Sequence, residues 1–214
     1  MRISCPGQRE FPKLHLISTG RSRAAHHMNI AEQLEDARAG NAAAQKVLFD
    51  HFGDSMMALC CRYVKNRADA EELLLDGFYK FFKHLKNFRY HGEAALYAWI
   101  RTIMVRECLM FLRRQRAFTM LSPEPAETAA DVAPEGEPLA GLSAAEIFDL
   151  IIRLPVGYRT VFNLRVIEGM EHKEIAKALG ISEGTSKSQL SKARILLQKL
   201  LLQKGIHYVK RKSQ

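Results

Sequence analysis

Lys187, Ser188, Ser191 and Lys192, in the C-terminal third of the chain, could contact nucleic acid. A lysine ammonium group can donate to guanine O6 and N7, and a serine hydroxyl can bond a base edge or a phosphate. Lysine also releases counterions when it neutralises a phosphate. Arg194 follows on the same segment, and we expect it to hold a phosphate. These residue types predict a helix that enters the major groove of DNA and reads it with its N-terminal part.

The surrounding residues, 172–194, have the pattern of a helix-turn-helix motif. The first helix needs a small residue where the second helix crosses it, and Ala176 supplies one. The tight turn needs a residue that accepts a positive φ, and Gly180 supplies that. Ser182 can cap the second helix. The residues expected to face the buried side are Ile181, Leu190, Ala193 and Leu197.

Residues 180–184 also match G-x-S-x-G, the pattern of a hydrolase nucleophile elbow. That elbow requires a strand before the serine, whereas residues 172–179 have helical periodicity, and downstream only His207 could serve as a base. The adjacent His26 and His27 receive no function. With no paired carboxylates, metal cluster or phosphate loop, the sequence predicts no catalytic residue, no metal and no cofactor, and an enzyme is disfavoured.

The rest of the chain also has the period of helices with one buried face. In the N-terminal half, Asp69 is expected to cap a helix, and a further helix is expected over 95–116. No alternating pattern of a strand appears, so the predicted fold is all-α. The expected apolar faces are Leu48, Phe52, Met56, Leu59 and Tyr63; Leu74, Phe78, Phe81 or Phe82, and Leu85; Trp99, Ile100, Ile103, Met104, Leu109 and Leu112; Ile147, Leu150, Ile151 and Leu154; and Val161, Phe162, Leu164, Val166 and Ile167.

Composition divides the chain into two small helical domains. Residues 119–141 contain four prolines and five acidic residues but no basic one, which predicts a flexible acidic linker. Gly169 is a further expected helix stop. The predicted organisation is a disordered basic arm at 1–27, a helical domain at 28–118, the linker, a helix-turn-helix domain at 142–204, and a basic tail at 205–214.

The net charge of +9 suggests a polyanionic partner. The positive charge lies on both helical blocks, because 61–116 has 12 basic and 6 acidic residues (+6) and 142–214 has 13 and 6 (+7). No apolar run reaches the length of a membrane span, so no membrane insertion is expected. The four cysteines have no C-x-x-C spacing, which favours reduced thiols in the cytoplasm.

Three segments resemble the extracytoplasmic-function (ECF) group of RNA polymerase sigma factors. Residues 154–198 resemble region 4, residues 68–88 region 2.2, and residues 91–116 regions 2.3 and 2.4, in the order that the family has them. The resemblance implies a non-enzymatic initiation factor that binds core RNA polymerase and directs it to promoter DNA. A stand-alone helix-turn-helix regulator is the alternative, and it would need no polymerase-binding helix.

The resemblance also implies roles for particular residues. Region 4 would read the upstream promoter element with Lys187, Ser188, Ser191, Lys192 and Arg194. The residues implied to melt the downstream element and hold its flipped base are Phe88, Arg89, Tyr90, His91, Arg101, Arg106, Arg113 and Arg114. The residues implied to bind the coiled coil of the largest polymerase subunit are Leu74, Asp76, Phe78 and Phe82, although their apolar members could equally be domain core. Trp99 is expected to be core.

Two positions depart from the family pattern. Arg106 stands where family members often have an asparagine that recognises the flipped base, which predicts a phosphate or guanine contact, or an altered downstream specificity. Ser186 stands where valine is common, which predicts slightly looser packing. Further implied partners are the polymerase flap, bound by region 4, and an inhibitory anti-sigma factor.

Overall fold

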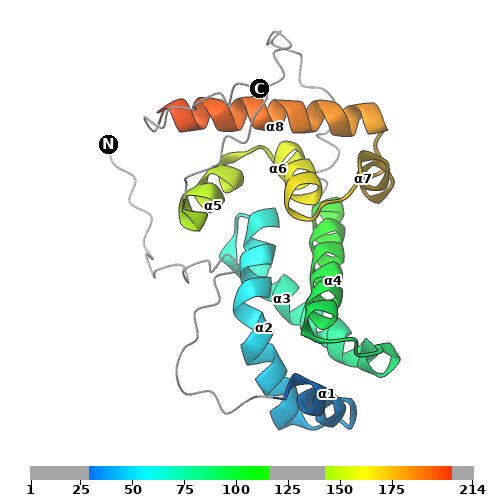
Figure 1. Ribbon diagram of the computed structural model, residues 1–214. Coiled ribbons are helices and arrows are strands. Elements are labelled where there is room, and N and C mark those ends of the chain that lie inside the picture. The colour runs from blue at the N-terminus through cyan, green and yellow to red at the C-terminus, as the bar shows by residue number, and fades with distance from the viewer. Residues whose placement is uncertain (1–28, 116–142, 204–214) are drawn as a thin grey trace, which may run out of the picture.

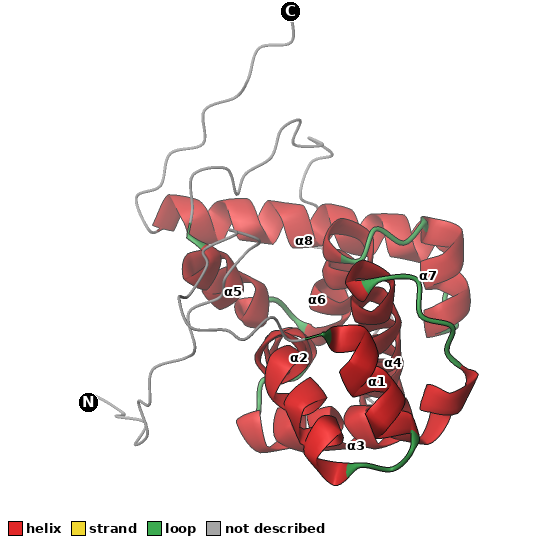
Figure 2. Ribbon diagram, turned by 60° about the horizontal axis from the view of Figure 1, so that its bottom comes forward, coloured by secondary structure: helices red, strands yellow, loops and turns green. Residues whose placement is uncertain are grey.

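The chain has 214 residues, and the computed structural model describes 29–115 and 143–203 of them. In these two ranges the regular structure is helical and contains no strand (Figure 2), so the all-α prediction is confirmed. The predicted arm, linker and tail, at 1–27, 119–141 and 205–214, lie outside the described residues. The helices are α1 (Ile30–Arg38), α2 (Ala42–Tyr63), α3 (Arg67–His84), a 3₁₀-helix (Leu85–Asn87), α4 (Glu93–Arg114), α5 (Ala144–Arg153), α6 (Val156–Phe162), a π-helix (Asn163–Ile167), α7 (His172–Leu179) and α8 (Glu183–Gln203).

Short polar side chains begin several of these helices. The residues that cap α1, α2, α3 and α5 are Asn29, Asn41, Asn66 and Ser143. Asp69 was expected to cap the third of these helices, and that prediction is wrong. The Oδ1 atom of Asn66 accepts from the backbone N–H of Ala68 at 3.0 Å, and Asp69 lies inside the first turn. An acidic side chain there still favours the helix, because it faces the positive end of the helix dipole.

The N-terminal block packs α2, α3 and α4 side by side, with α1 at one end (Figure 1). The apolar face predicted on α2 is confirmed, since all five of its residues are buried. Helices α3 and α4 approach closely at Gly77, where an added Cβ would lie 2.2 Å from the sulfur atom of Met104. A larger residue at position 77 would therefore push α3 and α4 apart or displace Met104.

The C-terminal block places the long helix α8 across α5 and α6, with α7 at its N-terminal end (Figure 1). Leu190, Ala193 and Leu197 of α8 are buried as predicted. Val166 was predicted to be buried but is 46% exposed. It lies in the π-helix, whose wider turn departs from the 3.6-residue period on which that prediction was based.

Candidate nucleic-acid interface

The helix-turn-helix has the predicted turn. Gly180 has a φ of +69°, in the left-handed region, and the N–H of Ile181 donates to the carbonyl of Ala176 at 3.1 Å. The Ser182 hydroxyl accepts from the N–H of Thr185 at 2.9 Å, which caps α8. The conformation of Gly180 and the Ser182 cap therefore set the direction in which α8 starts after α7.

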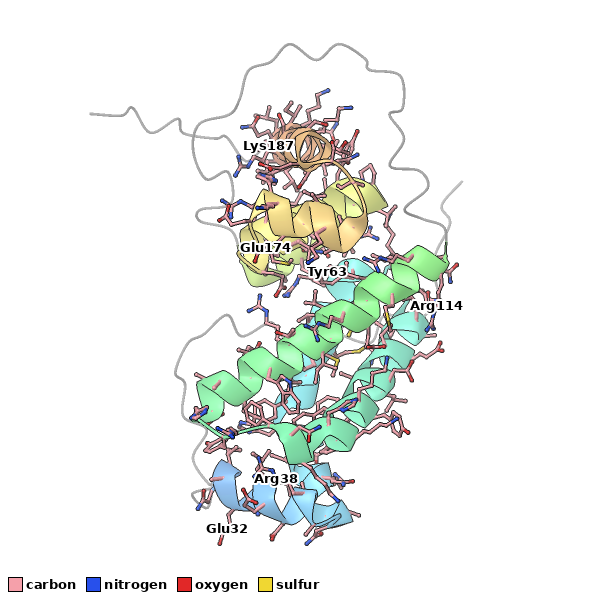
Figure 3. All side chains as sticks on the ribbon, turned by 90° about the vertical axis from the view of Figure 1, so that its right-hand side faces the viewer. Glu32, Arg38, Tyr63, Arg114, Glu174 and Lys187 are labelled. Atoms are coloured by element: carbon pink, nitrogen blue, oxygen red, sulfur yellow. The ribbon has the colours of Figure 1, made fainter. Side chains whose placement is uncertain are left out.

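The predicted base-reading residues lie on the first turns of α8, and Figure 3 shows Lys187 on the outside of this helix. Lys187, Ser188 and Arg194 are exposed, and Ser191 and Lys192 are half-buried. The ammonium group of Lys187 lies 2.8 Å from a carboxylate oxygen of Glu183, and this contact lowers the pKa of the Glu183 carboxyl. Exposed pairs one helical turn apart are weak, so Lys187 can exchange this carboxylate for a phosphate or a guanine.

Ser186, the departure from the family pattern in this helix, is fully buried between α7 and α8. Its hydroxyl shares a 2.9 Å hydrogen bond with Nδ1 of His172. Burial, with the charges of Arg165 and Lys187, lowers the pKa of His172 and favours the neutral ring. What the structure shows at this position is a polar contact between the two helices, which the sequence did not indicate, and the looser packing stays a prediction.

The residues predicted to act on the downstream element lie along α4 and in the loop before it. The exposed members of this set are Arg89, His91, Arg106, Arg113 and Arg114. Phe88 and Tyr90 are half-buried, and the ring of Phe88 stacks on Trp99 with centroids 4.5 Å apart and planes 8° apart. Trp99 also meets Phe81 edge-on at 5.4 Å, and it is half-buried at the edge of the core and not inside it, where it had been expected. One face of Phe88 is therefore already covered.

Arg101 differs from the other arginines of this set. Its Nε atom lies 2.5 Å from a carboxylate oxygen of Glu168, and one terminal nitrogen donates to the carbonyl of Ile167 at 2.8 Å. Both partners belong to the C-terminal block. Arg101 is therefore engaged within the protein.

The residues of α3 predicted to bind polymerase do not all lie on its solvent-facing side. Leu74 and Phe78 are 8% and 2% exposed, so both belong to the core, the alternative raised for them above. Asp76 is exposed, and Phe82 is half-buried. The large apolar side chains that α3 does present to solvent are Leu75, 61% exposed, and Tyr79, 64% exposed. Sequence reasoning missed them, because the run of three leucines at 73–75 allows two phases of the same helical period.

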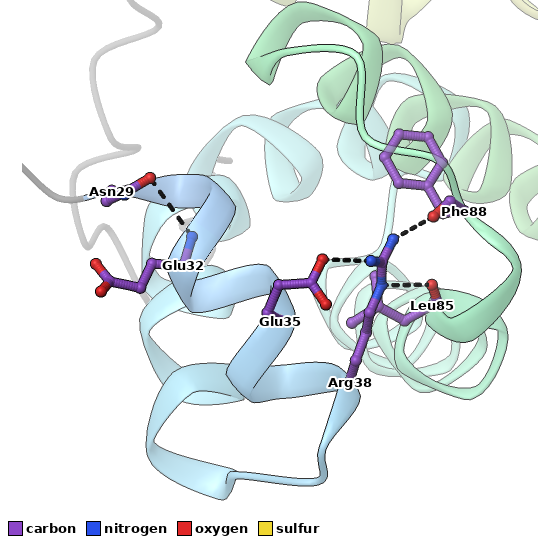
Figure 4. A network of polar contacts seen from close by, with 6 residues as sticks. All are labelled: Asn29, Glu32, Glu35, Arg38, Leu85 and Phe88. Carbon is purple, nitrogen blue, oxygen red and sulfur yellow. Dashed lines mark hydrogen bonds and ion pairs between the residues drawn. The ribbon is translucent and has the colours of Figure 1, made fainter.

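Arg38 at the end of α1 holds the loop between α3 and α4 (Figure 4). Its Nε atom donates to the carbonyl of Leu85 at 3.2 Å, a terminal nitrogen donates to the carbonyl of Phe88, and the other pairs with Glu35. One guanidinium group thus spans both ends of the turn that precedes the exposed Arg89 and His91. The N-terminal helix positions the start of the downstream loop in this way.

The Arg38→Met variant should lower the free energy of unfolding by about 1–3 kcal/mol, because two partly buried carbonyl groups lose a charged donor. Urea unfolding followed by circular dichroism measures this change. Lys46→Met is the matched control, since Lys46 pairs with Asp50 in the open, with side chains 72% and 57% exposed, and should change stability by no more than about 0.5 kcal/mol. Equal stability of the two variants would contradict the bracing role of Arg38.

The chain is similar to known sigma factors in both blocks. The family model for sigma-70 region 2 matches residues 48–118, and the model for sigma-70 region 4 matches residues 144–197. The ECF RNA polymerase sigma factor SigM of Mycobacterium tuberculosis is 30% identical over 177 residues, which cover 82% of this chain and 86% of that protein. The ECF RNA polymerase sigma-E factor of Haemophilus influenzae is 28% identical over 185 residues, covering 79% and 96%.

Among solved structures, the sigma factor RpoE in complex with the anti-sigma factor NepR from Bartonella quintana is 23% identical, covers 73% of this chain and 96% of its own, and has a TM-score of 0.44. With both regions present in order, the chain belongs to the sigma-70 family. Within that family it is a member of the ECF group of RNA polymerase sigma factors. The stand-alone regulator is not favoured.

In 29–115 and 143–203, no helix is long and apolar enough to cross a membrane. The same stretches hold no group of three or more His, Cys, Asp or Glu side chains that could bind a metal ion.

Proposed function

We propose that this ECF sigma factor binds core RNA polymerase through the solvent-facing side of α3. Leu75, Asp76 and Tyr79 form that surface together with the half-buried Phe82, and we call these four residues the α3 face. A contiguous exposed apolar patch bordered by polar residues often marks a surface that a partner covers. The exposure of Leu75 and Tyr79 is the observation that carries this proposal.

Promoter DNA would be read by two separate surfaces. At the upstream element, α8 would enter the major groove with Lys187, Ser188, Ser191 and Lys192, while Arg194 holds a phosphate. At the downstream element, the exposed arginines of α4 would follow the backbone beside the loop of Arg89, Tyr90 and His91. The exposed guanidinium of Arg106 suits a phosphate or a guanine. Phe88 could hold a base only on the ring face that Trp99 leaves free.

The remaining properties follow from family membership. The protein would act by binding alone, with no catalytic residue or cofactor of its own, and it would work in the cytoplasm, where polymerase and promoter are. An anti-sigma factor that covers the polymerase-binding surfaces is a further proposed partner, as is the polymerase flap for region 4. The sigma factor RpoE from Bartonella quintana was solved in complex with the anti-sigma factor NepR.

Runoff transcription with core polymerase and a promoter library tests the proposed function. The purified full chain should co-migrate with core polymerase and start transcripts at a defined subset of promoters. If, in the absence of any inhibitor, the protein neither binds core polymerase nor directs initiation anywhere, the proposal is wrong.

A further inference from the structure

His172 begins α7 and lies against α8, the helix that would read the upstream element. Its Nδ1 atom is 2.9 Å from the hydroxyl of Ser186, which is fully buried. A serine hydroxyl can donate to a bare ring nitrogen or accept from a protonated one. The contact therefore holds the imidazole ring in the same place whether His172 is neutral or charged.

The second ring nitrogen of His172 is available to a ligand. The residue is half-buried, and its Nε2 atom makes no hydrogen bond to a described residue and is not among the buried unpaired atoms of that part of the chain. Because Nδ1 is anchored on Ser186, the direction in which Nε2 points is fixed. The ring thus presents a potential hydrogen-bond donor on the surface of the helix-turn-helix.

Charged groups from three segments face this ring. Arg165 of the π-helix and Lys187 of α8 oppose a positive charge on it. Glu171, the residue before α7, and Glu183 of α8 favour one. Arg165 pairs with Glu171 at 3.0 Å. Lys187 pairs with Glu183 at 2.8 Å. Burial and the two cations outweigh the carboxylates, so the pKa of His172 lies below its ordinary value and the ring is neutral at pH 7 in the free protein.

A DNA phosphate would reverse this balance. The carboxylates of both ion pairs are exposed, and exposed pairs are weak, so a phosphate can draw Arg165 and Lys187 toward itself and neutralise them. In a helix-turn-helix the first helix crosses the DNA backbone while the second enters the groove. His172 lies where the two helices meet, and a negative charge close to the ring favours its protonated form.

We propose that His172 is a proton-linked contact to the upstream element, in which Nε2 donates to a backbone phosphate and the ring takes up a proton on binding. A phosphate contact carries no base information, so His172 would raise affinity without choosing a sequence. This inference rests on the proposed reading of the upstream element by α8.

The sign of the pH dependence follows from the proton that is taken up. Near neutral pH the bound ring holds a proton that the free ring lacks, so the affinity for DNA rises as the pH falls. The gain is complete at the pH where the free ring is protonated as well. At alkaline pH neither ring is charged, and the affinity reaches its lower limit.

Fluorescence anisotropy of the full chain tests this linkage between about pH 5.5 and pH 8, which spans the ordinary titration of histidine. The probe is a duplex that carries only the upstream element of a promoter selected from the library. The wild-type protein should bind it about fivefold more tightly at the lower pH. Fivefold corresponds to about 1 kcal/mol, the upper end for an exposed ion pair.

Two variants of His172 separate charge from position. His172→Gln takes up no proton and should lose the fivefold gain. His172→Lys is charged throughout this range and should bind at both pH values about as tightly as the wild-type protein does at the lower one. Circular dichroism at both pH values checks that each variant keeps its helix content.

His84→Gln is the matched control, because His84 is exposed in the last turn of α3, outside the helix-turn-helix. It should keep the wild-type pH dependence. A gain that persists in His172→Gln, or a wild-type affinity that does not change with pH, would overturn the inference. Loss of all selectivity for the upstream element by the wild-type chain would instead contradict the proposed function, so the two failures are distinguishable.

Discussion

Core polymerase should bind the Leu75→Ser/Tyr79→Ser variant at least about 30-fold more weakly than the wild-type protein. A large aromatic anchor in a protein interface commonly contributes 2 kcal/mol or more, and 1.4 kcal/mol corresponds to about tenfold in affinity. Both side chains are more than 60% exposed in the free protein, so their replacement removes apolar surface from the α3 face without opening a cavity. Titration of fluorescently labelled core polymerase with each sigma variant measures the change.

The control keeps the apolar area. Leu75→Met/Tyr79→Phe should bind core polymerase within about threefold of wild type, because hydrophobic swaps of similar volume are well tolerated. The serine variant should unfold within about 0.5 kcal/mol of wild type for each substitution, as exposed positions do. Wild-type affinity in the serine variant would show that polymerase is held elsewhere.

Lys187→Ala/Lys192→Ala should lose selectivity for the upstream element while its affinity for core polymerase stays unchanged. Each lysine that neutralises a phosphate adds about 0.9 to the slope of log K against log salt concentration. Removing two should therefore flatten the slope by about 1.8 if both contact phosphate. A lysine that donates to a guanine instead costs about 1–3 kcal/mol and relaxes preference at that base pair. Fluorescence anisotropy with promoter duplexes across a salt series separates the two cases.

Lys199→Ala is the comparison for this experiment. Lys199 is exposed on α8 but lies three turns beyond Lys187, outside the N-terminal part that would enter the groove. Its removal should leave selectivity intact and the slope nearly unchanged. If removal of Lys199 changed the selectivity and the salt slope as much per lysine as removal of Lys187 and Lys192, α8 would attract DNA by charge alone and would not read its sequence.

Much of the fold could be predicted, because the evidence for it is local. Gly180 takes the left-handed conformation and Ser182 caps α8 for reasons contained in a few neighbouring residues. The buried faces of α2 and α8 follow from spacings of three and four. The cap of α3 was predicted wrongly, because Asn66 and Asp69 are both suitable capping residues and the sequence did not show at which of them the helix begins.

The candidate site was less predictable where it depends on which side of a helix faces solvent or on which distant residue pairs with a side chain. On α3, the residues around positions 73–79 fit two faces equally well, and in the fold Gly77 lies against Met104 with Leu74 buried and Leu75 exposed. On α4, nothing near Arg101 in the sequence distinguishes it from Arg106. The difference lies in Glu168, 67 positions further along the chain.

The sequence by itself determined the helical class and the helix-turn-helix. These depend on interactions within one or two helical turns, where residue type and spacing decide the energy. Only the tertiary structure decided which side of α3 faces outward, that Arg38 braces the downstream loop, and that Glu168 pairs with Arg101. Those outcomes depend on how whole helices pack, and the free energy of a buried charge or a capped carbonyl exists only once distant segments have met.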